Sequence, residues 1–405
     1  MQGSVNRQRC AVSIAVIDMK KQKDAGLQYL MELGIRPAKD KNGVYLQLQE
    51  RLGKGPADEL KKELWGETDA QRIYDIKNAD WKTAVTFSGA YDGDFYRQAC
   101  NWLGAHKEQF GQEILEVGCD CGIISCFLGR LLPQTHITAI DRTQTAIAAA
   151  EQLAERLQVK NVTFLCTDLH DLAAGQFDTV LSMRTMHENI ADRNIHPSFL
   201  LLLEQAQLYG NAVAEYAERL MDRVRQGGNL ISIEKGEKNP AFLGWLLNLH
   251  ANGLTVLEQD YTELQCRMVG CDVSFQATIA EKQNVQSQNV YAFWCSLFPV
   301  DPDGYQFHGW AAETVLQNMT QDLQQLLTGA MIYNQAGEAC GKYAAWTLKS
   351  RPDVVLYYQG SADGTTLSLY EGSLQQAICQ QIDTVLQQCR MQGLTVALLP
   401  QSGQS

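Results

Sequence analysis

The chain has 405 residues, of which 45% are hydrophobic and 20% are charged, which is ordinary for a globular protein of roughly two or three domains. The formal net charge of −12 is unevenly distributed. Residues 1–100 carry 16 Lys and Arg against 14 Asp and Glu, a balance of +2, so the rest of the chain carries −14. Because such an acidic body repels phosphate backbones, we expect no DNA partner and no large nucleic-acid surface.

The cysteine pattern and the apolar runs indicate the compartment. The twelve cysteines include no Cys-x-x-Cys pair and no Cys/His cluster at zinc spacing, so we expect neither a disulfide scaffold nor a metal site. The apolar run Cys10–Ile17 is followed at once by Asp18-Met19-Lys20-Lys21 without a cleavage site, which argues against a secretory signal. No run approaches the roughly 20 apolar residues of a membrane span. We therefore predict a cytoplasmic protein with no membrane partner.

Residues 1–85 are predicted to form a mostly helical N-terminal extension. Leu27, Leu30 and Met31 form an apolar stripe that ends at Gly34, and two further stripes follow. The segment Phe87–Asp92 reads as a turn-rich loop with two aromatic residues, and a helix is expected to follow it.

Residues 86–284 alternate between strand-like and helix-like segments, which predicts an α/β domain with a doubly wound, mostly parallel, seven-stranded sheet. Helices are expected at Thr145–Leu157, Ser198–Arg225 and Phe242–Ala251. The candidate strands are Ile114–Val117, His136–Ile140, Val162–Cys166, Thr179–Ser182 and Leu230–Glu234, with a closing antiparallel pair at Cys266–Met268 and Val273–Ala280.

Residues 285–405 are predicted to form a separate small α+β domain, whose role the sequence does not indicate. One helical stripe runs from Val315 to Leu326 and another from Leu374 to Cys389. Between them, strands are expected at Tyr343–Leu348, Val354–Tyr358 and Thr365–Tyr370, the last two joined by a turn containing Asp363. Tyr305–Leu327 and Leu367–Cys389 share a strand–Gly–helix pattern, as a degenerate repeat would. The alternatives for the domain are a dimerisation module that forms a homodimer, a substrate lid and a partner site.

The motif that organises the chain is Ile114–Gly122, read Ile-Leu-Glu-Val-Gly-Cys-Asp-Cys-Gly. A buried strand, a glycine-bearing turn and a helix start form a ligand-binding corner, because glycine admits a close ligand and the helix start offers unpaired N–H groups. A dinucleotide site would need glycines where Asp120 and Ile123 stand, and an aspartate facing a pyrophosphate would be repulsive. The pattern disfavours NAD and FAD.

The segment Leu115–Gly122 resembles the first motif of the class I (Rossmann-like) S-adenosylmethionine-dependent methyltransferase family. That resemblance implies S-adenosylmethionine as cofactor, because this ligand is cationic and tolerates acidic residues in the loop. It implies that Glu116 faces the methionine end, with Gly118 and Gly122 alongside. The sequence departs from the family pattern at Asp120, which replaces the middle glycine.

Two further acids fall where this family needs them. Asp141 ends the second strand, and its carboxylate can accept both ribose hydroxyls. Asp168 follows the third strand and resembles the residue that accepts from the adenine amino group. Each alone reads as a turn or N-cap aspartate, but together they support the resemblance. The resemblance also implies a covering role for Tyr91, and it adds neighbours in the same loops to the expected cofactor site: Cys119, Arg142, Leu169 and Met183.

The end of the fourth strand supplies candidates for the methyl-transfer chemistry. It lacks the Asn/Asp-Pro-Pro-aromatic sequence of amino-methylating nucleic-acid enzymes and looks more like the small-molecule branch. His187 is the candidate general base, and Glu188 could orient it or bind a cationic substrate. Arg184 could anchor a substrate carboxylate, and Glu234 at the end of the fifth strand points to the same edge.

Three functions therefore stay open at this level. The leading one is a methyltransferase that acts on a small-molecule acceptor. The second is a methyltransferase that acts on a protein or RNA. The third is a non-catalytic binding or scaffold protein that retains the fold.

Overall fold

The computed structural model of the protein describes residues 24–65, 76–190, 202–236, 238–269, 271–283, 288–297, 307–308, 312–313, 316–317, 319–361 and 364–400. The predictions for Cys10–Ile17, Tyr305, Val315 and Asp363 lie outside these residues, as does the start of the helix expected from Ser198. None of the helices in the described ranges is long and apolar enough to cross a membrane.

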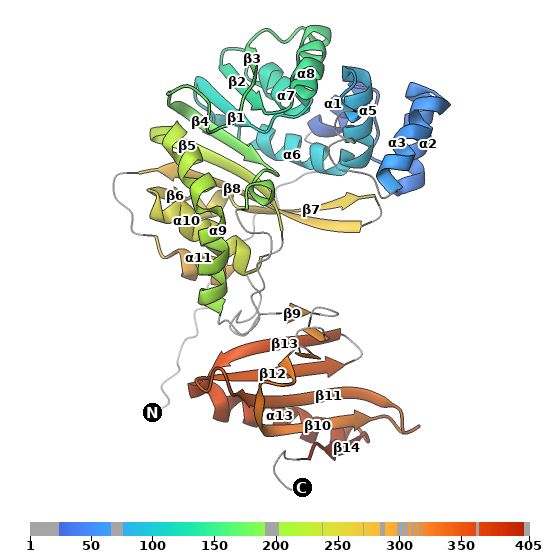
Figure 1. The fold of residues 1–405 in the computed structure, drawn as a ribbon, viewed down its shortest axis with the longest axis vertical. Helices are drawn as coiled ribbons and strands as arrows, with labels where there is room; N and C mark the ends of the chain where they lie inside the picture. Colours follow the sequence, from blue (N-terminus) through green and yellow to red (C-terminus); the bar gives the residue numbers. More distant parts are fainter. Residues whose placement is uncertain are drawn as a thin grey trace, which may run out of the picture.

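The N-terminal region is helical as predicted, and its helices lie beside the first sheet (Figure 1). The segment Phe87–Asp92 was predicted to be a loop, and this prediction is wrong: its residues up to Tyr91 belong to a helix that Asp80 caps by accepting from Thr83 N. Inside that helix Gly89 has no Cβ, which lets Ile35 pack close. The helices of this region are α1 (Ala25–Glu32), α2 (Lys41–Leu52), α3 (Lys54–Trp65), α5 (Trp81–Tyr91) and α6 (Gly93–Ala105).

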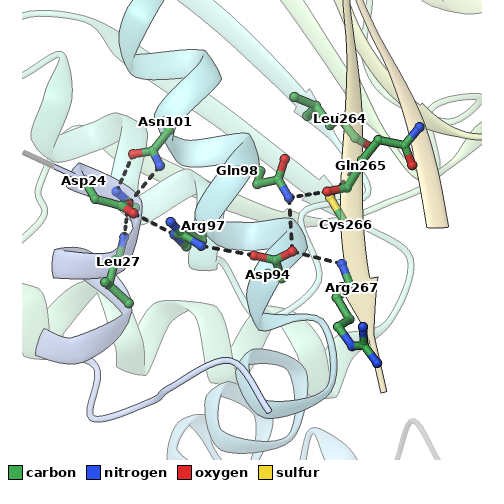
Figure 2. A network of polar contacts seen from close by, with 11 residues as sticks. Asp24, Leu27, Asp94, Arg97, Gln98, Asn101, Leu264, Gln265, Cys266 and Arg267 are labelled. Atoms are coloured by element: carbon green, nitrogen blue, oxygen red, sulfur yellow. Dashed lines mark hydrogen bonds and ion pairs between the residues drawn. The ribbon is translucent and has the colours of Figure 1, made fainter. Parts of the chain in front are cut away.

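A polar network ties α1 to α6 and to a later strand (Figure 2). Asp24 caps α1 and accepts from Asn101 Nδ2 at 2.8 Å and from Arg97 Nε at 2.6 Å. Asp94, one turn before Arg97, accepts from the backbone N–H of Arg267 at 2.9 Å. The network therefore joins α1 to α6 and α6 to the later strand at Gln265 and Arg267.

The first sheet has eight strands in the order β3-β2-β1-β4-β5-β8-β6, with β7 paired to β8. The first five in this order are parallel, and every pairing of β8 is antiparallel, so the mostly parallel sheet is confirmed. The predicted number of seven strands is one too low, because a three-residue strand is too short to show a periodic pattern. The strands are β1 (Glu113–Val117), β2 (His136–Asp141), β3 (Val162–Cys166), β4 (Phe177–Met183), β5 (Val224–Lys235), β6 (Leu254–Val256), β7 (Thr262–Met268) and β8 (Cys271–Lys282).

Helices cover both faces of this sheet. Successive residues of β1 point to opposite faces, so Ile114 packs in one core with α1, α6, α7 and α8, and Leu115 packs in another with α9, α10 and α11. The doubly wound arrangement is thus confirmed, and Trp245 lies fully buried in the second core. The helices added here are α7 (Ile123–Leu131), α8 (Gln144–Leu157), α9 (Leu202–Arg223), α10 (Pro240–Ala251) and α11 (Val290–Ser296).

The C-terminal region forms a second, antiparallel sheet of six strands in the order β14-β10-β11-β12-β13-β9. Helix α13 (Gln375–Met391) packs on one face through Ile378, Ile382 and Leu386, and Trp346 and Tyr358 lie in a core on the other face. The prediction that a helix extends to Leu326 is wrong, because a strand already begins at Leu323. The strands are β9 (Phe307–His308), β10 (Leu323–Tyr333), β11 (Ala339–Leu348), β12 (Val354–Ser361), β13 (Gly364–Glu371) and β14 (Thr395–Leu398).

Candidate functional site

A cavity of about 870 Å³ opens at the edge of the first sheet where the parallel strands end. The strands β1, β2 and β4 run parallel, so the loops that follow them meet at this edge. Helices α5 and α6 add Phe87, Tyr91 and Tyr96 to the wall, and α9 adds Asn211 and Tyr216. The cavity is therefore built by three parts of the chain that are far apart in the sequence.

The glycine loop after β1 has the left-handed backbone that its sequence predicts. Gly118 has a φ of 76° and Gly122 a φ of 75°, and Asp120 between them also has a positive φ, of 46°. Aspartate tolerates this region better than most residues, so the turn forms without the middle glycine. A Cβ atom added at Gly118 would clash with the methyl group of Thr185. Only glycine fits at that position.

Asp141 and Asp168 both line the cavity, at the ends of β2 and β3. Asp141 accepts from Thr143 N at 2.8 Å and from Asp120 N at 3.0 Å, which fixes its carboxylate and leaves further lone pairs on both oxygens. Asp168 accepts from His170 N at 2.9 Å. Burial raises the pKa of Asp141, and the nearby carboxylate of Asp120 raises it further.

Each cationic side chain of the cavity wall lies beside a carboxylate of the same wall. Lys77 Nζ lies 2.6 Å from Asp120 Oδ2, and Arg184 Nη1 lies 2.7 Å from Asp92 Oδ2. The pairs Arg142–Glu188 and Arg219–Glu215 lie on more exposed parts of the wall.

The lining therefore contains four cationic side chains against six acidic ones, a formal balance of −2. Asp141 and Asp168 are the two acids of the lining without a cationic partner among the residues that the structure describes.

Arg184 is held in a strained and enclosed position at the end of β4. Its φ is 59°, and its guanidinium group lies over the ring of Phe95 at 5.1 Å from the centroid. Burial alone would lower the pKa of Arg184, but the carboxylate of Asp92 raises it, so the side chain stays cationic. An arginine already paired in this way is less free to anchor a substrate carboxylate than the sequence alone indicates.

Glu234 lies behind the cavity wall and not on it. Its carboxyl group is buried and accepts from Ser182 Oγ at 3.0 Å and from Met186 N at 3.2 Å. Thr185 and Tyr216, whose hydroxyl groups lie 2.6 Å apart, stand between this carboxyl and the cavity. Burial raises the pKa of Glu234 to about 7. The residue contacts the hydroxyl network that faces the cavity.

Three other predicted residues, one in β1 and two in the loop, do not line the cavity either. Glu116 is 2% exposed, and its Oε2 atom has no hydrogen-bond partner within the described part of the chain. Burial raises its pKa to about 7. Cys119 is buried in a small core with Ala139 and Ile147, and Gly122 forms the N-cap of α7. The three residues shape the loop and its entry from β1 without facing the cavity.

The cavity thus collects most of the residues that the sequence predicted for the site. His187 belongs to the 3-10 turn Met186–Glu188, and its side chain lies outside the described part of the structure. The predicted residues that line the cavity are Tyr91, Gly118, Asp120, Asp141, Arg142, Asp168, Leu169, Met183, Arg184 and Glu188.

The sequence interpretation missed two parts of the wall. Asn211, Glu215 and Arg219 are spaced by four residues on α9, so they share one face of that helix. This polar stripe was visible in the sequence, but it begins 89 residues after Gly122, so nothing in the sequence indicated that it lies near the glycine loop. Lys77 gave a weaker signal still. Its partner Asp120 stands where a glycine is usual, and a buried carboxylate there calls for a cation from elsewhere in the chain.

Residues 114–200 match a family model described as a methyltransferase domain. The match identifies a methyltransferase domain over these residues, which confirms the resemblance of the first motif to the class I S-adenosylmethionine-dependent methyltransferases.

The chain also matches curated relatives. It is 36% identical over 94 residues to a malonyl-[acyl-carrier protein] O-methyltransferase of Bacillus cereus, an alignment that covers 22% of this chain and 34% of that protein. It is 28% identical over 145 residues to ribosomal RNA small subunit methyltransferase G of Chlorobaculum tepidum, covering 34% of this chain and 65% of that one. The chain thus spans about a third of the length of the Bacillus cereus relative.

Among solved structures, the chain is similar to magnesium protoporphyrin IX methyltransferase from Synechocystis PCC 6803 with bound S-adenosylmethionine. The TM-score is 0.35 and the identity 14%, over 58% of this chain and 96% of that one.

The residues of the cavity fit the cofactor of this domain class. S-adenosylmethionine carries a sulfonium and an ammonium against one carboxylate, so its net positive charge complements a cavity whose lining balances at −2. Asp141 and Asp168 are fixed acceptors suited to the ribose hydroxyls and the adenine amino group. Gly118 has no side chain, and its backbone forms part of the cavity lining.

Proposed function

We propose that this protein is an S-adenosylmethionine-dependent methyltransferase that acts on a small-molecule acceptor in the cytoplasm. The observation that carries the proposal is that Asp141 and Asp168 line the same cavity as the polar face of α9. A cavity of this size offers room for a cofactor and a small acceptor side by side. We retain the proposed division into an N-terminal helical extension, a methyltransferase domain over 86–284 and a C-terminal α+β domain.

The bound cofactor supplies a methyl group on an activated sulfonium. The task that this leaves to the chain is to hold an acceptor in line with that methyl group. In our proposal the acceptor lies against α9, where Asn211 and Tyr216 offer it hydrogen bonds. Glu188 and Arg142 form a pair at the exposed rim, so we assign them to binding. His187 remains our candidate for the general base, and Glu234 is assigned the role of a positioning residue through Thr185 and Tyr216.

The names of the relatives include both a malonyl-[acyl-carrier protein] O-methyltransferase and a ribosomal RNA methyltransferase, so we choose the acceptor class from the charge of the protein. The acidic charge of the chain and the −2 balance of the cavity support a small acceptor over RNA. The free thiols of the described cysteines are compatible with a reducing compartment. A homodimer through the C-terminal domain stays a prediction.

The first experiment is calorimetric titration of the full chain with S-adenosylmethionine and S-adenosylhomocysteine. We expect micromolar binding that Asp141→Ala weakens by about 1.5–3 kcal/mol, the size of a lost charged hydrogen bond. Asp383→Ala, on the exposed side of α13, is the matched control and should bind as the wild type does. Failure of the wild type to bind either ligand would exclude the methyltransferase proposal.

A second experiment addresses the acceptor class. The protein is incubated with S-adenosylmethionine carrying a tritiated methyl group and with a cell extract separated into low-mass and macromolecular fractions. We expect label to be transferred in the low-mass fraction. Transfer confined to the macromolecular fraction would favour the protein or RNA alternative.

A further inference from the structure

An ion pair in the glycine loop links the methyltransferase domain to the chain that precedes it. Lys77 lies well before residue 114, yet its ammonium group contacts Asp120 Oδ2 at 2.6 Å, and both residues line the cavity. Lys77 is 8% exposed, so its charge lies inside the wall and not at the rim. The helix α5 adds Ser88, whose Oγ lies 3.5 Å from the same carboxylate oxygen.

The position of Asp120 requires this partner. Its backbone N–H donates to Asp141 Oδ2 at 3.0 Å, so the carboxylate of Asp141 lies beside the turn that carries Asp120. Burial by itself would raise the pKa of Asp120, but the ammonium group of Lys77, together with the hydrogen bonds that the carboxylate accepts, lowers it. Asp120 is therefore an anion, and Lys77 supplies the charge that lets an anion occupy a glycine position in a ligand-binding loop.

A second ion pair lies close to the first. Asp92 accepts from Arg184 through Oδ2, and its other oxygen, Oδ1, is buried without a hydrogen-bond partner in the described ranges. Asp92 is 9% exposed and lines the cavity. The carboxylate of Asp120 also acts on Arg184, where it adds to the effect of Asp92 in raising the pKa. The two pairs therefore form one cluster of two cations and two anions, which we call the four-charge cluster (Lys77, Asp92, Asp120 and Arg184).

We propose that the four-charge cluster recognises the zwitterionic amino-acid end of the cofactor, with Lys77 donating to its carboxylate and Asp92 Oδ1 accepting from its ammonium group. This inference rests on the proposed function. It accounts for the buried Asp92 oxygen, because a carboxylate oxygen enclosed in protein needs a donor. It also explains why an aspartate replaces the middle glycine at position 120, because this anion holds the ammonium group of Lys77 at the cavity wall. The N-terminal segment then completes the cofactor site of the domain matched at 114–200.

The experiment compares three ligands that share the adenosine part. S-adenosylmethionine and S-adenosylhomocysteine have the amino-acid end, and 5′-methylthioadenosine lacks it. Calorimetry on the full chain with Lys77→Met should show a Kd at least about tenfold weaker for the first two ligands, as for a lost charged hydrogen bond. The Kd for 5′-methylthioadenosine should stay within about twofold of that of the wild type. Lys82→Met, at an exposed position of α5, is the matched control and should change none of the three values.

A second variant covers the case in which Lys77→Met leaves Asp120 unpaired and unfolds the loop. Lys77→Met combined with Asp120→Gly removes both charges and returns glycine to a left-handed position, and it should show the same selective loss. An equal loss for 5′-methylthioadenosine in both variants, or no loss for S-adenosylhomocysteine, would overturn the inference alone. Absence of binding of all three ligands to the wild type would overturn the proposed function together with this inference.

Discussion

The two sheets of this protein differ in where they leave polar groups. In the first sheet, parallel strands end at one edge, and the loops after β1, β2, β3 and β4 bring Asp120, Asp141, Asp168 and Arg184 into one cavity. In the second sheet, antiparallel neighbours end at opposite edges, so polar loops divide between the two ends and both faces bury apolar cores. The comparison shows how strand direction alone concentrates chemistry in one half of the molecule.

The largest expected effect is a loss of unfolding free energy that tests whether the two sheets unfold separately. Ile231 in β5 and Ile382 in α13 are both fully buried, so Ile→Ala at either position should cost about 2–5 kcal/mol of unfolding free energy. We expect scanning calorimetry to show two transitions, of which S-adenosylmethionine raises only the one that Ile231→Ala lowers. A single transition that both substitutions and the ligand shift together would mean that the two sheets unfold as one unit.

The next effect is a pH dependence that belongs to the first region. Glu234 is buried with a pKa raised to about 7, so the folded state binds a proton that the unfolded state has lost above its ordinary value near 4.3. This contribution to stability is fully present below about pH 4.3 and is lost as the pH rises to about 7. Above about pH 7 the loss is complete, and it amounts to about 4 kcal/mol.

Glu234→Gln should flatten the fall in chemical-denaturation curves measured between pH 4.5 and 8. Glu371→Gln, an exposed residue in the second region, is the control and should leave the curve unchanged. An unaltered pH dependence in the Glu234 variant would contradict the assignment.

A smaller effect distinguishes two glycines that share a left-handed backbone. Gly118 in the loop after β1 has a φ of 76°, and Gly337 between β10 and β11 has a φ of 81°. Gly→Ala at either position should cost about 1–2 kcal/mol of stability through backbone strain. A Cβ atom at Gly337 meets no described atom within 4 Å, whereas one at Gly118 clashes with Thr185. Calorimetry should therefore show that only Gly118→Ala loses cofactor binding. Equal binding by both variants would place the cofactor elsewhere.

The smallest expected effect concerns the contact between the regions. Arg351, in the turn between β11 and β12, lies 2.9 Å from Glu204 on α9 and also pairs with Asp353. Such solvent-accessible pairs contribute at most about 1 kcal/mol, so Arg351→Met should shift neither calorimetric transition by more than a few degrees. A large shift would show that the C-terminal region supports α9 and hence the cavity wall.

The sequence by itself determined the features that depend on neighbours in the chain. A strand, a glycine turn and a helix start can be read at Ile114–Gly122, because each follows from local residue preferences. Asp141 and Asp168 could be placed in the site because each directly follows a strand of a parallel sheet, whose topology makes those ends converge. Their position on the cavity wall agrees with that prediction.

The tertiary structure alone decided which distant segments complete the cavity. Phe87–Asp92 has loop-like residues, yet packing of Gly89 against Ile35 makes most of it a helix. Glu234 ends the expected strand, but its side chain is enclosed behind Thr185 and Tyr216. Lys77 meets Asp120 only because the N-terminal helices dock against the first sheet. An ion pair between residues so far apart in the chain leaves no pattern in the local sequence. Its two partners can therefore be assigned to the site only once the fold is known.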